Sequence, residues 1–122
     1  MNFSKPIDMP RGTHYGNNYY LVYSKKIHRT CRFYSNLEYY NFLSLEINPK
    51  IEKFCEQPVK IEIIQENKIQ HAIIDMWVLY RDGREEFQEV KYTSELTGDS
   101  AEAIRSQEQI RREHLWCTEN NI

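Results

Sequence analysis

The chain has 122 residues, 40% of them apolar and 28% charged, with a formal net charge of −2. This length suits one domain with a single core, and the near-neutral charge lacks the basic excess of many nucleic-acid-binding proteins. The three cysteines form no Cys-x-x-Cys pair, which argues against a zinc site or a disulfide framework. No apolar run approaches the ~20 residues of a membrane span. We therefore expect a cytoplasmic protein without membrane segments.

The N-terminal residues 1–18 contain prolines, glycines and an Asn-Asn pair, a composition typical of a flexible leader. We expect the folded domain over residues 19–122, beginning with a strand at "YYLVY", residues 19–23. Residues 24–34 predict a turn and a second short strand. Four basic residues in this segment predict either a DNA-binding patch or a solvated basic turn: Lys25, Lys26, Arg29 and Arg32.

The segment "SNLEYYNFLSLEINP" gives the clearest helix signal. Ser35 is a good N-cap, and Glu38 three residues later completes a capping box. Pro49 ends the helix. Apolar side chains at helical spacing predict its buried face: Leu37, Tyr40 (with Asn41 as the alternative), Phe42 and Leu45.

Residues 59–92 predict an antiparallel meander, because strand-like runs alternate with turn signals. The strand "VKIEII" is followed by a polar turn at residues 65–68, and "IQHAIIDMWVLY" reads as one long apolar strand. Asp82-Gly83 is a two-residue hairpin signal before the return strand "REEFQEVKY". A second helix follows over "AEAIRSQEQIRREHLW", capped by Asp99 or Ser100, with a thin apolar face formed by Ala103, Ile104, Ile110 and Leu115. The fold class expected is mixed α/β, an α+β sheet flanked by helices.

Asp75 lies inside an apolar run, where an isolated carboxylate costs several kcal/mol. The predicted hairpin sets Asp75 opposite position 90, and a slip of one residue sets it beside Glu89 or Lys91. Two carboxylates and the Val90 carbonyl are hard oxygen ligands that suit Mg²⁺. A lysine on the same strand face as Glu89 can orient a water or offset phosphate charge, which suits metal-assisted phosphodiester hydrolysis. A surface ion pair between Glu89 and Lys91 is the alternative.

Glu38 is a further acid that could reach such a metal from the first turn of the helix. The capping box explains Glu38 without any catalysis. Both roles can hold only if the side chain leaves the cap to reach the metal.

The order of these parts resembles the PD-(D/E)xK, or restriction-endonuclease-like, nuclease superfamily. The closer resemblance is to the TnsA family, the endonuclease subunit of heteromeric transposases. It rests on segments from Ser35 to Trp116, about two-thirds of the chain: "SNLEYYNFLSLEINPKIEKFCEQP", "IIDMWV", "QEVKY", "SEL" and "EQIRREHLW". The resemblance implies a restriction-endonuclease-like core and a Mg²⁺-dependent DNA endonuclease, with Mn²⁺ as a substitute metal.

The resemblance also implies roles for individual residues. Glu38, Asp75 and Lys91 match the family's two catalytic acids and its catalytic lysine. Glu89 matches the variable position on the metal side, so the implied catalytic set is Glu38, Asp75, Glu89 and Lys91. The implied metal ligands are Asp75, Glu89, the Val90 carbonyl and Glu38. Gln57 and Gln107 are implied as supporting residues, and a hydrogen bond at the strand–Pro58 junction is an equal explanation for Gln57.

The family's activity implies hydrolysis of the transposon-end DNA strand that is not joined to target, in a bacterial cytoplasm. The implied partners are double-stranded DNA, a DDE-type transposase subunit and a regulatory ATPase. Relatives carry another strand and a C-terminal domain after the second helix, so we expect this chain, which ends at Ile122, to hold the catalytic domain without that last strand. Two alternatives stay open: a non-catalytic DNA- or protein-binding module of the same fold, and a restriction or repair nuclease of the same superfamily.

Overall fold

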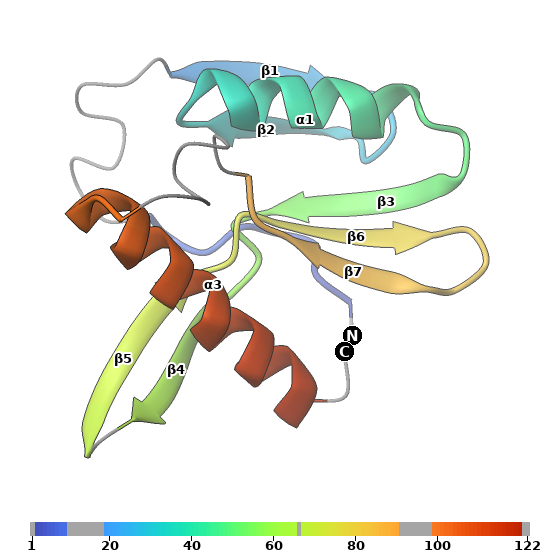
Figure 1. The fold of residues 1–122 in the computed structure, drawn as a ribbon. Helices are drawn as coiled ribbons and strands as arrows, with labels where there is room; N and C mark the ends of the chain where they lie inside the picture. Colours follow the sequence, from blue (N-terminus) through green and yellow to red (C-terminus); the bar gives the residue numbers. More distant parts are fainter. Residues whose placement is uncertain (1, 10–18, 66, 91–98, 121–122) are drawn as a thin grey trace.

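The computed structural model describes residues 2–9, 19–65, 67–90 and 99–120 (Figure 1). Within these ranges the chain has a mixed α+β fold, with two helices and three small antiparallel sheets. The expectation of an α+β fold is therefore confirmed. No helix in this described part is long and apolar enough to cross a membrane.

The first layer consists of a strand pair and a helix. β1 (Tyr20–Ser24) and β2 (Arg29–Phe33) pair antiparallel, as the sequence predicted, and α1 (Asn36–Ile47) lies along them (Figure 1). The predicted N-cap is confirmed, because the Ser35 hydroxyl accepts the Glu38 backbone N–H at 3.2 Å and donates to the Glu38 carboxylate at 3.0 Å. The reciprocal bond of the capping box, from the Ser35 backbone N–H to that carboxylate, stays a prediction. The helix ends before Pro49, as expected.

The main core lies between this layer and a three-stranded sheet. The sheet has the order β3 (Ile51–Glu56), β6 (Met76–Tyr80), β7 (Glu85–Gln88), with β6 in the centre. The Phe42 ring of α1 packs 5.0 Å from Phe33 and 5.8 Å from Phe54. Leu45 is buried as predicted, whereas Tyr40 is 57% exposed, so the predicted stripe was wrong at that position.

The remaining hairpin extends away from the body of the domain in Figure 1. β4 (Lys60–Gln65) pairs with β5 (Lys68–Ile73) in a sheet of its own. The predicted meander and the single long strand across residues 69–80 were therefore wrong. The chain changes sheets at residues 74–75, where the Ile74 N–H donates to the Val59 carbonyl and the Asp75 carbonyl accepts the Gln57 N–H.

The second helix, α3 (Ala101–Glu119), packs against β4 and β5 and is capped by the Ser100 hydroxyl, which accepts the Ala103 N–H. Ile104 and Leu115 are exposed, so the predicted apolar face was wrong at these two positions. The inward face instead follows a 3–4 spacing through the buried Ala103, Ser106 and Glu113 and the half-buried Ile110.

The first residues of the predicted leader lie against the domain. The Phe3 ring packs edge-on against Trp77 at 5.3 Å, and the Ile7 N–H donates to the Gln57 carbonyl at 2.9 Å. Residues 10–18 lie outside the described residues, and the division into a leader and a domain stays a prediction.

Candidate active site

The hairpin of β6 and β7 decides which residue Asp75 faces. Met76 pairs with Gln88, so the same register continued by one residue sets Asp75 opposite Glu89. The turn has three residues rather than the predicted two, because the Tyr80 N–H donates to the Arg84 carbonyl. Gly83 supplies the left-handed conformation (φ 91°) that such a three-residue turn needs. The extra turn residue is the physical source of the one-residue slip.

Asp75 and the end of β7 are tied together by two hydrogen bonds. The Val90 N–H donates to the Asp75 carboxylate at 2.8 Å, and the Asp75 N–H donates to the Glu89 carboxylate at 3.3 Å. The two acids are thus held beside each other, with the Val90 peptide group next to the Asp75 carboxylate. Lys91 lies outside the described residues, so the expectation that its side chain shares a strand face with Glu89 stays a prediction.

Glu38 reaches the same region from the start of α1. Its carboxylate accepts a hydrogen bond from the Gln57 side chain at 3.0 Å while it remains at the Ser35 cap. Burial raises the pKa of Glu38, and the nearby Asp75 charge raises it further, against hydrogen bonds from Ser35 and Gln57. Glu38 therefore lies at the cap and within electrostatic reach of Asp75 at the same time.

Gln57 connects these segments. It is 2% exposed and has a φ of 38°, a left-handed conformation that is uncommon for a residue other than glycine. Its backbone N–H donates to the Asp75 carbonyl at 2.9 Å, and its side chain donates to Glu38. Such conformations persist where the surroundings over-determine them, and they cluster at functional sites. Gln57 thus makes hydrogen bonds at the strand–Pro58 junction and also lies beside the candidate acids. The two explanations given for Gln57 from the sequence, a junction hydrogen bond and a supporting place near the site, are therefore compatible.

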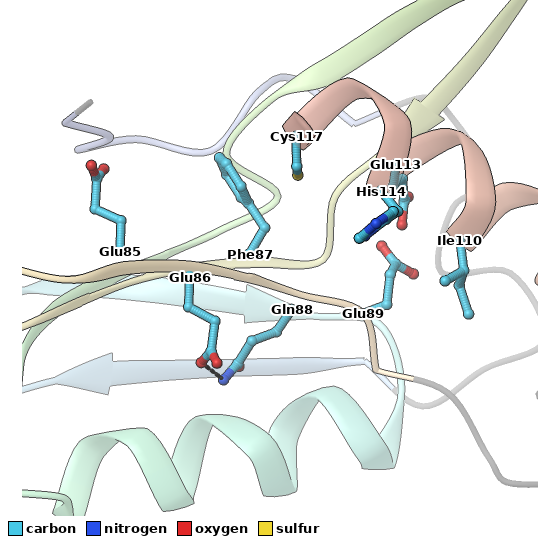
Figure 2. Close-up of a pocket in the computed structure, with 9 residues that line it drawn as sticks. All are labelled: Glu85, Glu86, Phe87, Gln88, Glu89, Ile110, Glu113, His114 and Cys117. Atoms are coloured by element: carbon cyan, nitrogen blue, oxygen red, sulfur yellow. Dashed lines mark hydrogen bonds between the residues drawn. The ribbon is translucent and has the colours of Figure 1, made fainter. Parts of the chain in front are cut away.

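A pocket of about 370 Å³ lies between β7 and α3. Figure 2 shows the Glu89 carboxylate directed toward α3, near Glu113 and His114, while Gln88 extends to the other side of the strand. Gln88 meets α1 there, accepting a hydrogen bond from Asn41 at 3.0 Å. Gln107 is half-buried on α3 and does not line this pocket.

Glu113 is the pocket residue that sequence reasoning missed. It is 5% exposed and accepts a hydrogen bond from Gln109 at 3.1 Å. Its position three residues after Ile110 on the buried stripe was the signal that could have found it.

Two residues of the predicted basic patch have structural contacts. The Lys26 ammonium donates to the carbonyls of Leu45, Asn48 and Ile51 at 3.0, 2.6 and 2.9 Å, which satisfies the C-terminal end of α1. Arg29 forms a two-pronged ion pair with the buried Glu56 carboxylate. Lys25 and Arg32 are exposed. A DNA contact by these four residues stays a prediction.

The comparisons with known proteins agree with the class of protein that this arrangement of acids suggests, a nuclease domain. The sequence model of the TnsA-like endonuclease N-terminal domain matches residues 48–122. The chain therefore belongs to the TnsA-like endonuclease family, which confirms the resemblance. A search of the curated proteins finds no match to the chain. The matched region contains Asp75, Glu89 and Lys91 but begins after Glu38, which accepts a hydrogen bond from Gln57 and lies within electrostatic reach of Asp75.

Proposed function

We propose that the protein is a Mg²⁺-dependent DNA endonuclease subunit of a heteromeric transposase that hydrolyses one strand at transposon ends. The observation that carries this proposal is the pairing of Asp75 with Glu89 and Val90 in a domain of an endonuclease family. The proposal includes a restriction-endonuclease-like core, a DDE-type transposase subunit that processes the other strand, and a regulatory ATPase as a further partner.

The donor set suits a divalent cation. Asp75 and Glu89 offer carboxylate oxygens, Val90 offers a carbonyl, and Mg²⁺ prefers such hard ligands while it keeps several waters. Burial raises the pKa of Glu38 and the nearby Asp75 charge raises it further, and a bound cation would offset this second, like-charge contribution. Within the described ranges, no group of three or more His, Cys, Asp or Glu side chains is placed to hold a metal, and the proposed site combines two carboxylates with the Val90 carbonyl.

When bound, Mg²⁺ would supply a Lewis acid for the phosphate oxygens and lower the pKa of a coordinated water. The chain's own residues position the reaction. Gln57 and Ser35 fix the Glu38 carboxylate, and the Asp75 carboxylate is fixed by the Val90 N–H. Lys91 offsets negative charge that develops on the phosphate as water attacks phosphorus in line with the leaving oxygen.

Cleavage of transposon-end DNA in Mg²⁺ or Mn²⁺, with the transposase subunit present, tests the proposal. We expect Asp75→Asn and Lys91→Ala each to lower the rate by a factor of a hundred or more, with an unchanged melting temperature. Glu86→Gln is the matched control, because Glu86 is an exposed acid of the same strand that contacts Tyr80 and Gln88. Retained cutting by Asp75→Asn would refute the nuclease assignment.

Calorimetric titration with Mn²⁺ separates the alternatives. We expect binding to the wild type that is lost in Asp75→Asn and kept in Glu86→Gln. Intact DNA binding without any metal affinity would identify a non-catalytic module of the same fold.

A further inference from the structure

A second pocket, of about 320 Å³, lies next to the candidate acids. Its walls are residues 6–9 of the N-terminal segment and three side chains of the domain, Arg32, Tyr34 and Gln57. The Gln57 side chain also donates to the Glu38 carboxylate, so this one residue borders both the pocket and the acids. Whatever fills the pocket therefore lies beside the site proposed for hydrolysis.

The side chains of this pocket have the chemistry that binds a nucleotide. Arg32 is exposed and carries a permanent positive charge, which suits a phosphate. Tyr34 offers a ring and a hydroxyl, and its pKa is raised by burial, then by Tyr19, with Arg32 opposing and Glu38 adding to the shift. The Tyr34 hydroxyl thus lies within electrostatic reach of both Arg32 and Glu38. Asp8, an exposed acid of the N-terminal segment, also borders the pocket.

The outward face of the β1–β2 hairpin extends this surface. Leu21 pairs with Arg32, and Tyr23 pairs with Thr30. Leu21 and Tyr23 are 59% and 60% exposed, and the Tyr19 ring lies 5.6 Å from Tyr34. A basic side chain among exposed aromatic rings is the combination with which proteins hold a nucleic-acid strand, the cation on the phosphates and the rings on the bases.

We propose that this pocket binds the nucleotide next to the scissile phosphate of the cleaved DNA strand. Arg32 pairs with the phosphate of that nucleotide, and Tyr34 contacts its sugar and base. The volume is near the lower end of the range for ligand pockets, which fits one nucleotide rather than a duplex. The placement beside the scissile bond rests on the proposed function, whereas binding of a DNA strand by Arg32 and Tyr34 does not.

Binding is measured first, in the Asp75→Asn background so that cleavage cannot interfere. The probe is a fluorescein-labelled duplex of random sequence with a frayed end, followed by anisotropy over a series of salt concentrations. We expect Arg32→Ala to weaken binding about tenfold or more and to lower the salt slope by about one. Lys50→Ala removes the same charge from an exposed residue outside the predicted basic patch, at the other end of β3 from Gln57, and we expect it to stay within about twofold of the parent.

Two variants of Tyr34 distinguish the contribution of its ring to DNA binding from that of its hydroxyl. Tyr34→Phe keeps the ring and is expected to bind nearly as the parent does, whereas Tyr34→Ala is expected to lose about fivefold or more. Arg32→Lys is expected to restore part of the affinity, and melting temperatures check that each variant is folded. Equal affinities for Arg32→Ala and Lys50→Ala would overturn the proposal.

The position of the pocket along the strand needs a second experiment. Neutral methylphosphonate linkages are placed one at a time around the cleaved bond of the duplex. We expect the linkage adjacent to that bond to weaken binding by the parent but not by Arg32→Ala. Equal sensitivity of both proteins at every linkage would overturn the placement. A protein that never cleaves, yet binds less well after Arg32→Ala, would keep the strand-binding site and reject the nuclease function.

Discussion

The ion pair between Arg29 and Glu56 gives a sharp test of the fold, and the perturbation is Arg29→Met. Glu56 is 0% exposed, and the Arg29 guanidinium donates to both of its oxygens at 2.9 and 2.5 Å. The backbone N–H of Arg32 adds a third hydrogen bond at 3.3 Å. Methionine keeps much of the side-chain volume but leaves a buried carboxylate without its cation.

The expected magnitude follows from that burial. Removing one partner of a buried ion pair lowers the free energy of unfolding by about 3–5 kcal/mol, a large part of the about 5–15 kcal/mol that stabilises a typical domain. The melting temperature should fall by on the order of 10–20 °C. Lys25→Met is the control, because it removes an exposed charge of the same segment and should change stability by less than about 0.5 kcal/mol.

Urea unfolding followed by circular dichroism measures both variants. The double variant Arg29→Met with Glu56→Gln should be more stable than the sum of the single effects predicts, because neither charge is then buried alone. A loss below about 1 kcal/mol for Arg29→Met would refute the reasoning. It would also make Arg29 available as a DNA contact, as the sequence alone suggested.

Three further predictions concern single positions. Because the pKa of Glu38 is raised above its ordinary value of 4.5, its contribution to stability is present below that pH and is lost as the pH rises through the raised value. In chelator-treated buffer, the melting temperature of the wild type minus that of Glu38→Gln should therefore fall above pH 4.5, and a flat difference would contradict the electrostatic account. Gly83→Ala should lose about 1 kcal/mol from backbone strain alone, since a Cβ there meets nothing within 4 Å, and Gly83→Asn should lose less. Ser100→Ala should lose about 1 kcal/mol by removing the cap of α3, and an unchanged urea midpoint would argue against that cap.

The sequence predicted helix caps and short strands correctly where residues close in sequence determine them. The Ser35–Glu38 cap and the β1–β2 pair are set by residues close in sequence, and both were predicted. The partition of the strands into separate sheets was not predicted, because the break at Asp75 involves a hydrogen bond with Gln57, 18 positions earlier in the chain. An apolar run alone does not indicate that the chain leaves one sheet and enters another within it.

The candidate site was predictable in part for the same reason. Pairing across the predicted hairpin set Asp75 opposite position 90, one residue from Glu89, which it faces in the structure. The length of the turn accounts for this difference of one residue. Glu113 was missed as a site neighbour because it lies on α3, and only the packing of that helix brings it close. Tyr34 was missed although it directly precedes the Ser35 cap.

The contacts of Gln57 also bear on when the candidate acids come together during folding. Its hydrogen bonds join Ile7, Glu38 and Asp75, which belong to three segments far apart in the sequence. The candidate acids come together only where these segments are assembled, so they are dispersed in an unfolded chain. Under the proposed function, dependence on the completed fold leaves unfolded copies unable to cut the DNA of the cell that makes them.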